Sequence, residues 1–228
     1  KTTLSSIPVM KPSTVRVKLA SGIFGIPDGI VTEAESARFF ANAIDTETKG
    51  FDIVVSHQGN VGDLSLTSDL AVTLAKTQRV DEINSSPQLA SQVNTYFGER
   101  ETYFLEFATP RIKANLGHVL QADKWQFFLR NSYFGAVTNP DTALGFSISG
   151  QGERYHPEFA GKVITDMSFG YDVTENMTLT IGSSNVFDIY PEKSPASLTS
   201  GNNFIYPRVT SQFGINGRTI FARLNFKL

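Results

Sequence analysis

The stretch Leu64-Ser65-Leu66-Thr67-Ser68-Asp69-Leu70-Ala71-Val72-Thr73-Leu74 decides the fold. The apolar side chains that share one parity are Leu64, Leu66, Leu70, Val72 and Leu74. The positions of the other parity are Ser65, Thr67, Asp69, Ala71 and Thr73. Because successive side chains of a β-strand point to opposite faces, this period of two predicts a strand with one apolar and one wet face. The strand is about twice as long as the ~5 to 6 residues that are usual in soluble proteins.

The same period recurs along the rest of the chain. Further strands are predicted at residues 51–56, 112–121, 124–134, 163–171, 177–182 and 220–228, with a short candidate at Val15 to Leu19. Residues 124–134 are apolar in part on both faces, and Asn131 falls on the more apolar one. The total of about eight is even, as in bacterial membrane barrels.

The connections between these strands alternate in length. Short turns are predicted at residues 57–63, 121–124 and 172–176, where Gly, Asn and Asp supply turn chemistry. Long connections rich in Gly, Pro, Ser and Asn are predicted at residues 75–110, 135–160 and 188–212, and a fourth covers residues 20–48. Short turns on one side and long loops on the other are typical of an up-and-down membrane barrel. A soluble sandwich has no reason to collect its long loops at one end.

The composition agrees with an all-β, antiparallel, transmembrane β-barrel. The chain has 18 Phe and 7 Tyr, but no cysteine and a net charge of -2. The missing thiols exclude disulfides and thiolate metal sites, and the lack of a basic cluster argues against a nucleic-acid partner. No apolar run approaches the ~18 residues of a membrane helix, whereas barrel strands need only alternate residues to be apolar.

The residues form no catalytic or metal-binding pattern. The three histidines, His57, His118 and His156, have neither helical spacing nor a cysteine partner. Ser147 does not stand in a G-x-S-x-G arrangement, because the glycines on either side are Gly145 and Gly150. We therefore expect no enzymatic activity, no cofactor and no metal.

The polar faces of the predicted strands carry several charged side chains. In a barrel they would face the lumen, since Arg or Lys on the lipid side costs roughly 2 to 4 kcal/mol at midplane. The predicted lumen-facing residues are Asp52, Asp69, Lys113, Arg130, Asp166 and Arg223. A generic wet wall without ligand specificity is the simpler interpretation of this set.

Ligand contacts are expected in the long loops, because loops on a rigid scaffold collect binding residues. The candidates are Arg154, Tyr155, His156, Asn202, Asn203, Phe204, Tyr206 and Arg208. Tyr190 and Tyr206 each precede a proline, so they are also candidates for structural corners.

Short motifs follow one another in order over most of residues 42–228. Near the C-terminus these are Gly170-Tyr171, Asn176-Met177-Thr178-Leu179-Thr180-Ile181-Gly182, Asn185-Val186-Phe187-Asp188, Tyr206-Pro207 and Gly217-Arg218. Upstream stand Gly50-Phe51-Asp52 after a polar stretch from Asn42, and Thr109-Pro110-Arg111-Ile112-Lys113. This set resembles the C-terminal part of a TonB-dependent outer-membrane receptor.

The resemblance implies uptake of a scarce nutrient, most often an iron chelate, across the outer membrane of a Gram-negative cell. It implies contact with outer-membrane lipid, energising by TonB through a plug that this chain lacks, and a possible surface lipoprotein partner. It also implies that barrel-assembly machinery reads the last strand at Leu224, Phe226 and Leu228, although the family usually ends on an aromatic residue.

The resemblance also bears on the extent of the chain. Transporters with a plugged lumen have about 22 strands, so we expect this chain to be the C-terminal portion of a larger barrel. Residues 48–228 would supply barrel strands, and residues 1–47 a poorly defined strand and a long loop. Two alternatives stay open: a complete small eight-stranded barrel acting as an adhesin or structural anchor, and a soluble carbohydrate-binding jelly roll.

Overall fold

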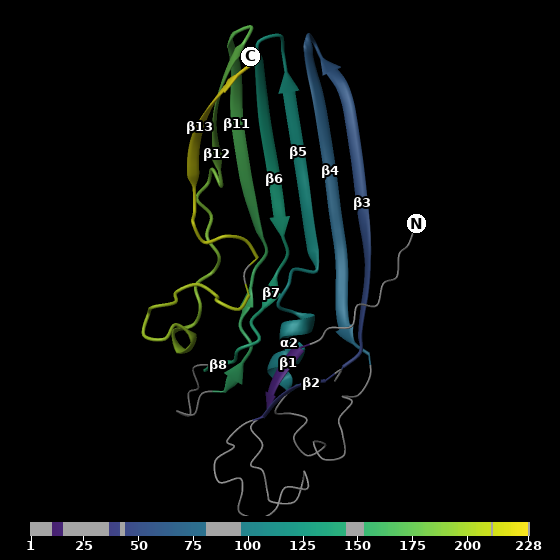
Figure 1. The fold of residues 1–228 in the computed structure, drawn as a ribbon, viewed down its shortest axis with the longest axis vertical. Helices are drawn as coiled ribbons and strands as arrows, with labels where there is room; N and C mark the ends of the chain where they lie inside the picture. Colours follow the sequence, from purple (N-terminus) through teal and green to yellow (C-terminus); the bar gives the residue numbers. More distant parts are fainter. Residues whose placement is uncertain are drawn as a thin grey trace, which may run out of the picture.

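The main element of the fold is one antiparallel sheet of seven strands in the order β13-β12-β11-β6-β5-β4-β3 (Figure 1). The computed structural model describes residues 11–15, 37–41, 44–80, 97–144, 153–210 and 212–227. The strands of the sheet are β3 (Thr46–Val61), β4 (Leu64–Arg79), β5 (Ile112–Gln121), β6 (Trp125–Phe134), β11 (Lys162–Thr174), β12 (Met177–Ser184) and β13 (Thr219–Phe226). Within the described residues this sheet is open, with β3 and β13 as its two edges.

The remaining elements are short. They are β1 (Lys11–Val15) paired with β2 (Ala37–Ala41), β7 (Val137–Thr138) with β10 (Glu158–Phe159), β8 (Ala143–Leu144) with β9 (Arg154–Tyr155), helix α2 (Glu99–Glu106) and the 3-10 turn η2 (Ala196–Leu198). Of the strand expected at Val15 to Leu19, only Val15 lies within the described residues. It ends β1, which pairs with β2 and not with the main sheet.

The predicted alternation of short and long connections is confirmed. Turns of a few residues join β3 to β4, β5 to β6 and β11 to β12, and they lie at the same end of the sheet as the C-terminus (Figure 1). The described residues of the connections at 80–111, 135–161 and 185–218 lie at the opposite end. Every second strand of the sheet therefore ends on the same side, which we call the loop-bearing end.

Several local predictions are wrong: the connections expected at residues 20–48 and 135–160 contain β2, the start of β3 and the short strands β7 to β10, and two further cases have a clear cause. Residues 57–61 were expected in a turn, but they continue β3 and pair with β4 down to Val61 and Leu64, because the hairpin closes on Gly62 at a φ of 62°. The connection at residues 75–110 was expected to be loop, but β4 runs on to Arg79 and α2 follows. The backbone N–H of Gly98 donates to the Glu101 carboxylate at 3.0 Å, and two acidic residues stand in the first turn of α2, which favour a helix N-terminus.

The strand registers combine the predicted apolar positions into one continuous face. One row of directly paired residues runs through Gly59, Leu66, Leu120, Phe127, Phe169, Ile181 and Ala222. Since side chains alternate along each strand, the apolar side chains of all seven strands lie on the same side of the sheet. We call this side the apolar face and the opposite side the polar face.

The apolar face is not covered by any described element. Phe51 is 74% exposed, Val55 and Ile181 are each 54% exposed, and Phe226 is 66% exposed. A row of large exposed apolar side chains across a whole sheet marks a surface that borders an apolar medium or a partner. No helix in the described part of the chain is long and apolar enough to cross a membrane.

Two pairs of polar residues on the apolar face bond to each other across neighbouring strands. The Ser68 hydroxyl lies 2.9 Å from Nδ1 of its direct partner His118. The Thr165 hydroxyl donates to Oδ1 of Asn131 at 2.8 Å, which explains why Asn131 is tolerated there. Such pairing is needed in a medium without water, because an unsatisfied polar group costs several kcal/mol there.

A matched pair of substitutions tests the facing. Val54 and Val55 are neighbours on β3 and both are exposed, Val54 on the polar face and Val55 on the apolar face. A lipid-facing apolar face predicts that Val55→Arg costs about 2 to 4 kcal/mol of folding stability in a bilayer, while Val54→Arg changes little. The measurement is the yield of heat-modifiable protein in outer membranes, followed by denaturant unfolding in lipid vesicles. Equal losses for the two variants would contradict the assignment of faces.

Candidate functional site: the polar face and the loop cap

The six predicted lumen residues share the polar face. Asp52 pairs with Thr73 and that row continues to Lys113, while Arg130 stands directly beside Asp166. Three of the carboxylates are held by neighbours on this face: Thr73 donates to Asp52 at 2.7 Å, Ser56 to Asp69 at 2.6 Å, and Arg130 to Asp166 at 2.6 Å. Within the described residues, no hydrogen bond or ion pair is found for the side chains of Lys113 or Arg223. That this face borders a lumen stays a prediction.

The polar face is less uniformly wet than its charges suggest. Phe128, Ile164 and Phe221 lie on it, and Phe134 contacts Phe213 from the β12–β13 connection, with the ring centroids 5.7 Å apart. The Phe221 ring occupies the space that a Cβ on Gly182 would need, so Gly182 is required by a close approach. The face therefore offers apolar contact area between its charged rows.

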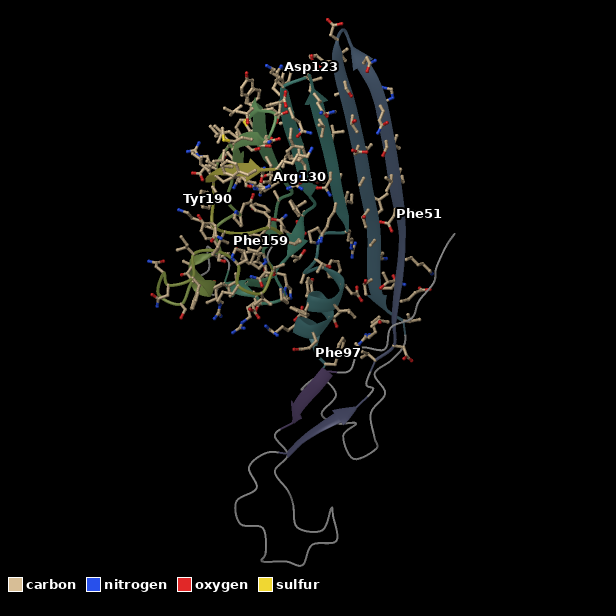
Figure 2. All side chains as sticks on the ribbon, turned by 45° about the horizontal axis from the view of Figure 1, so that its top comes forward. Phe51, Phe97, Asp123, Arg130, Phe159 and Tyr190 are labelled. Carbon is tan, nitrogen blue, oxygen red and sulfur yellow. The ribbon has the colours of Figure 1, made fainter. Side chains whose placement is uncertain are left out.

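The described part of the chain places most of its buried side chains at the loop-bearing end. We call this region, residues 97–111, 135–144, 153–161, 185–210 and 212–218, the loop cap. Figure 2 shows Phe97 and Phe159 at this end and Asp123 at the end with the short turns. The buried side chains of the cap include Phe97, Ala108, Val137, Asn139, Pro140, Ala143, Phe159, Thr199, Thr210 and Gln212. The long loops thus form a packed layer.

His156 joins the first long connection to the second. Its ring stacks on Tyr103 of α2 with centroids 3.5 Å apart and an angle of 10° between the planes. Nδ1 lies 2.9 Å from the Asn139 carbonyl oxygen, and Nε2 lies 3.4 Å from a carboxylate oxygen of Glu99 without forming a hydrogen bond. The His156 side chain is only 8% exposed. In this conformation the residue fastens the cap, whereas the neighbouring ligand candidates Arg154 and Tyr155 lie exposed on β9.

Gln212 joins the third long connection to the second. Its side-chain amide donates to the carbonyl oxygens of Gly135 and Ala160, at 2.6 and 3.0 Å. Gly135 follows the end of β6 and Ala160 precedes β11, so the amide satisfies two carbonyls beyond the last pair of that ladder. Glu192 strengthens the same junction through the Ala160 N–H at 3.3 Å and the Lys162 ammonium at 3.3 Å.

The motif Asn185-Val186-Phe187-Asp188 forms the corner where the chain leaves β12. Asn185 has a φ of 52° and Asp188 a φ of 57°, a left-handed conformation that Asn and Asp adopt more readily than most residues. The Asn185 side chain accepts from the Ile189 N–H at 2.9 Å and donates to the Ile189 carbonyl at 2.7 Å. The sequence motif therefore has a structural role. We call residues 185–188 the corner.

The corner also fixes the entry to the last strand. The Arg218 N–H donates to Asp188 Oδ1 at 2.8 Å. Gly217 has a φ of 66°, and a Cβ there would collide with the Tyr190 hydroxyl and lie 2.6 Å from Asp188 Oδ1. The Gly217-Arg218 motif is therefore explained by backbone conformation and a close approach.

The other ligand candidates lie along the third connection. Asn202, Asn203, Phe204 and Arg208 are exposed, and the Arg208 guanidinium lies 4.6 Å from the centroid of the Phe204 ring. The ring of Tyr206 stacks on Tyr190 with centroids 5.8 Å apart, which supports the alternative that these two tyrosines form a structural corner. A ligand role for the whole set stays a prediction.

Two further predicted features can be placed. Leu224 and Phe226 of the expected assembly signal lie exposed on the apolar face of β13, and Leu228 lies outside the described residues. Among the residues that the structure describes, no group of three or more His, Cys, Asp or Glu side chains could hold a metal ion. The burial of His156 and Gln212 could not be predicted from local sequence, because it depends on contacts between loops that are far apart in the chain.

Comparisons with known proteins give matches at the level of structure. No protein-family model matches the chain, and no curated protein matches it. The outer membrane transporter YddB from Escherichia coli superimposes on 85% of this chain with a TM-score of 0.56 and 10% identity. The copper transporter OprC covers 96% of the chain at 16% identity and a TM-score of 0.49, and the FrpB iron transporter from Neisseria meningitidis covers 86% at 16% identity and 0.49.

The likeness to YddB establishes the class of fold. The chain is an open antiparallel sheet with the architecture of part of an outer-membrane transporter barrel. It spans 27% of the YddB chain, 27% of OprC and 26% of FrpB. These structural neighbours are transporters by their names, not enzymes.

The corner makes a prediction about Tyr190. The nearby Asp188 carboxylate raises the pKa of the Tyr190 phenol above 10.0, because a second negative charge beside it is unfavourable; burial adds to the effect. We expect Asp188→Asn to lower that pKa toward 10.0 while the amide oxygen still accepts from the Arg218 N–H. The measurement is the ultraviolet titration of tyrosinate, with Tyr190→Phe in each background to isolate this residue. An unchanged Tyr190 titration in Asp188→Asn would contradict the electrostatic explanation.

Proposed function

We propose that this chain is part of the barrel wall and outer loops of a TonB-dependent transporter in the outer membrane of a Gram-negative cell. The observation that carries the proposal is the exposed apolar face of the seven-stranded sheet, combined with a packed loop cap at one end only. A lipid-facing barrel wall requires such a face, and short turns opposite long loops are its usual arrangement. The fold shared with part of YddB supports the same assignment.

In this proposal the loop cap faces the cell exterior and the short turns face the periplasm. The polar face, with Asp52, Asp69, Lys113, Arg130, Asp166 and Arg223, borders the lumen. Residues 48–228 supply wall and loops, residues 1–47 belong to a preceding strand and loop, and a plug outside this chain couples the barrel to TonB. Outer-membrane lipid contacts the apolar face, barrel-assembly machinery recognises the last strand, and a surface lipoprotein is a possible further partner.

The proposed ligand is an iron chelate. The exposed Arg154, Tyr155, Phe204 and Arg208 supply cations and rings that suit an anionic, aromatic chelate. Asn202 and Asn203 add amide groups for hydrogen bonds.

The two alternatives receive less support. A complete small barrel would pair its first long strand with its last, but among the described residues β3 and β13 are the unpaired edges of the sheet. A soluble jelly roll would bury the apolar face between two sheets. Here Phe51, Val55 and Phe226 lie open.

Uptake by the full-length protein tests the proposal. The gene is expressed in a Gram-negative host without its own iron-chelate receptors, and uptake of radioactive iron is followed for a panel of chelates. We expect saturable uptake of one chelate class that stops when tonB is deleted or a protonophore is added. Uptake that persists without TonB, or no uptake of any chelate by correctly inserted protein, would count against the function.

Loop variants test the ligand residues separately. We expect Arg154→Ala with Arg208→Ala to raise the chelate concentration for half-maximal uptake about tenfold or more, the effect of losing hydrogen bonds from charged groups. The matched control is Asp123→Ala with Glu175→Ala, since both residues are exposed in the short turns at the other end. Equal uptake curves for the two double variants would remove the loop residues from the site but leave the transport function standing.

A further inference from the structure

On the polar face, one row of directly paired residues has an acidic residue on each side of a single arginine. The registers place Ser56, Asp69, Gly117, Arg130 and Asp166 directly opposite one another on five adjacent strands, from β3 to β11. All five side-chain positions point to the same side of the sheet, because paired residues share a face. Arg130 therefore has an acidic neighbour on β11 and, beyond a glycine, a second on β4. Figure 2 shows Arg130 within this part of the sheet.

The two carboxylate oxygens of Asp166 accept hydrogen bonds from different places, one from Arg130 of the sheet and one from the corner. Oδ2 accepts from Nη2 and Nε of Arg130 at 2.6 and 3.2 Å. Oδ1 accepts from the backbone N–H of Asn185 at 2.9 Å, at the residue where the chain turns left-handed to begin the corner. The Asp166 side chain is 14% exposed, so little water is available to replace either partner. The carboxylate thus ties the corner to the position of Arg130.

Asp69 provides a second position for the same arginine. Asp69 and Arg130 are separated by two inter-strand spacings, about 10 Å between backbones, which the two side chains together can bridge. Gly117 stands between them, and a Cβ there would meet only the Asp69 carbonyl oxygen, at 3.9 Å. The path is therefore open. Arg130 is 49% exposed, and the Asp69 carboxylate is held by one hydroxyl, that of Ser56.

We propose that Arg130 is a latch with two positions, one on Asp166 as observed and one on Asp69 across Gly117, and that its position controls the corner of the β12–β13 connection. When Arg130 leaves, Asp166 is a poorly hydrated carboxylate without a counter-charge. Such a charge is unfavourable and has to turn toward water. Turning releases the Asn185 N–H, and the corner loosens.

The coupling also runs in the opposite direction. Opening of the β12–β13 connection removes the Asn185 N–H from Asp166, which weakens the hold of that carboxylate and favours Arg130 on Asp69. Linkage requires this reciprocity for any two equilibria that share a group. The latch therefore connects the polar face to the loop cap through a single side chain. It follows from the geometry of the row and does not depend on transport.

Hydrogen exchange in the full-length protein, reconstituted in lipid nanodiscs, tests the latch. One readout is exchange at the amides of Asp188 and Ile189, which bond to Asn185 within the corner, and of Val186, which bonds to the Thr165 carbonyl of β11 and so ties the corner to the sheet. The other readout is trypsin cleavage after the exposed Lys193 and Arg208. We expect Arg130→Gln to accelerate both at least about fivefold, the lower range of typical coupling. Asp69→Asn and Gly117→Val should slow both. Asp69→Asn removes the carboxylate of the alternative position, and Gly117→Val obstructs the path to that position.

The control is Asp52→Asn, which alters a carboxylate of the same face that bonds to Thr73 and not to the corner. Insertion of each variant is checked by heat-modifiable mobility on gels. If Arg130→Gln does not insert, Asp69→Asn and Gly117→Val still decide the question. Exchange in Arg130→Gln equal to that in Asp52→Asn, or exchange in both Asp69→Asn and Gly117→Val equal to the unaltered protein, would overturn the proposal.

Discussion

The backbone hydrogen-bond ladder of the seven strands is the constraint on which the other features depend. In hydrocarbon each backbone N–H and C=O has to be paired within the protein, and adjacent strands pair the groups that face each other. Once the ladder sets the spacing, every second side chain is free to be apolar and exposed. This explains how a chain with only 40% hydrophobic residues presents Phe51, Val55 and Ile181 on one continuous surface. It also explains why Ser68 with His118, and Thr165 with Asn131, form polar pairs on that surface.

Burial follows the opposite distribution from that of a soluble protein. Few side chains of the sheet are buried, whereas the long connections at residues 97–111, 135–161 and 185–218 supply most of the buried residues of the described chain. Loops usually lack enough contacts to order themselves. Here His156 and Gln212 satisfy backbone carbonyls of neighbouring segments, and Tyr103 adds a stacked ring. A surface that captures a ligand gains from this order, because less conformational freedom is lost on binding.

Period and turn chemistry predicted the parts of the structure that depend on local sequence. The alternation in residues 64–74 and 163–171 and the alternation of loop lengths are confirmed. The prediction was wrong where pairing overrode local signals: Gln58, Gly59 and Asn60 resemble a turn, yet their partners on β4 keep them extended. Helix α2 was missed because its eight residues lie within a long polar connection. The shared face of Arg130 and Asp166 was predicted, but the bond of Asp166 to the Asn185 N–H was not, since it depends on how the corner folds back.

Several links between sheet and cap are single hydrogen bonds, beside apolar contacts such as that of Phe134 with Phe213, and this has a mechanical consequence. Apolar packing is not directional, so a cap attached through a large apolar contact would resist displacement over its whole area. Hydrogen bonds from Asp166, Gln212 and Glu192 act instead at single points, and each is lost over a small change in distance or angle. A rigid wall joined to an ordered cap at such points allows the cap to move as a unit while the ladder stays intact. The corner at Asn185 and Asp188 is where this movement would be concentrated, because single hydrogen bonds to Asp166 and from Arg218 hold its left-handed residues.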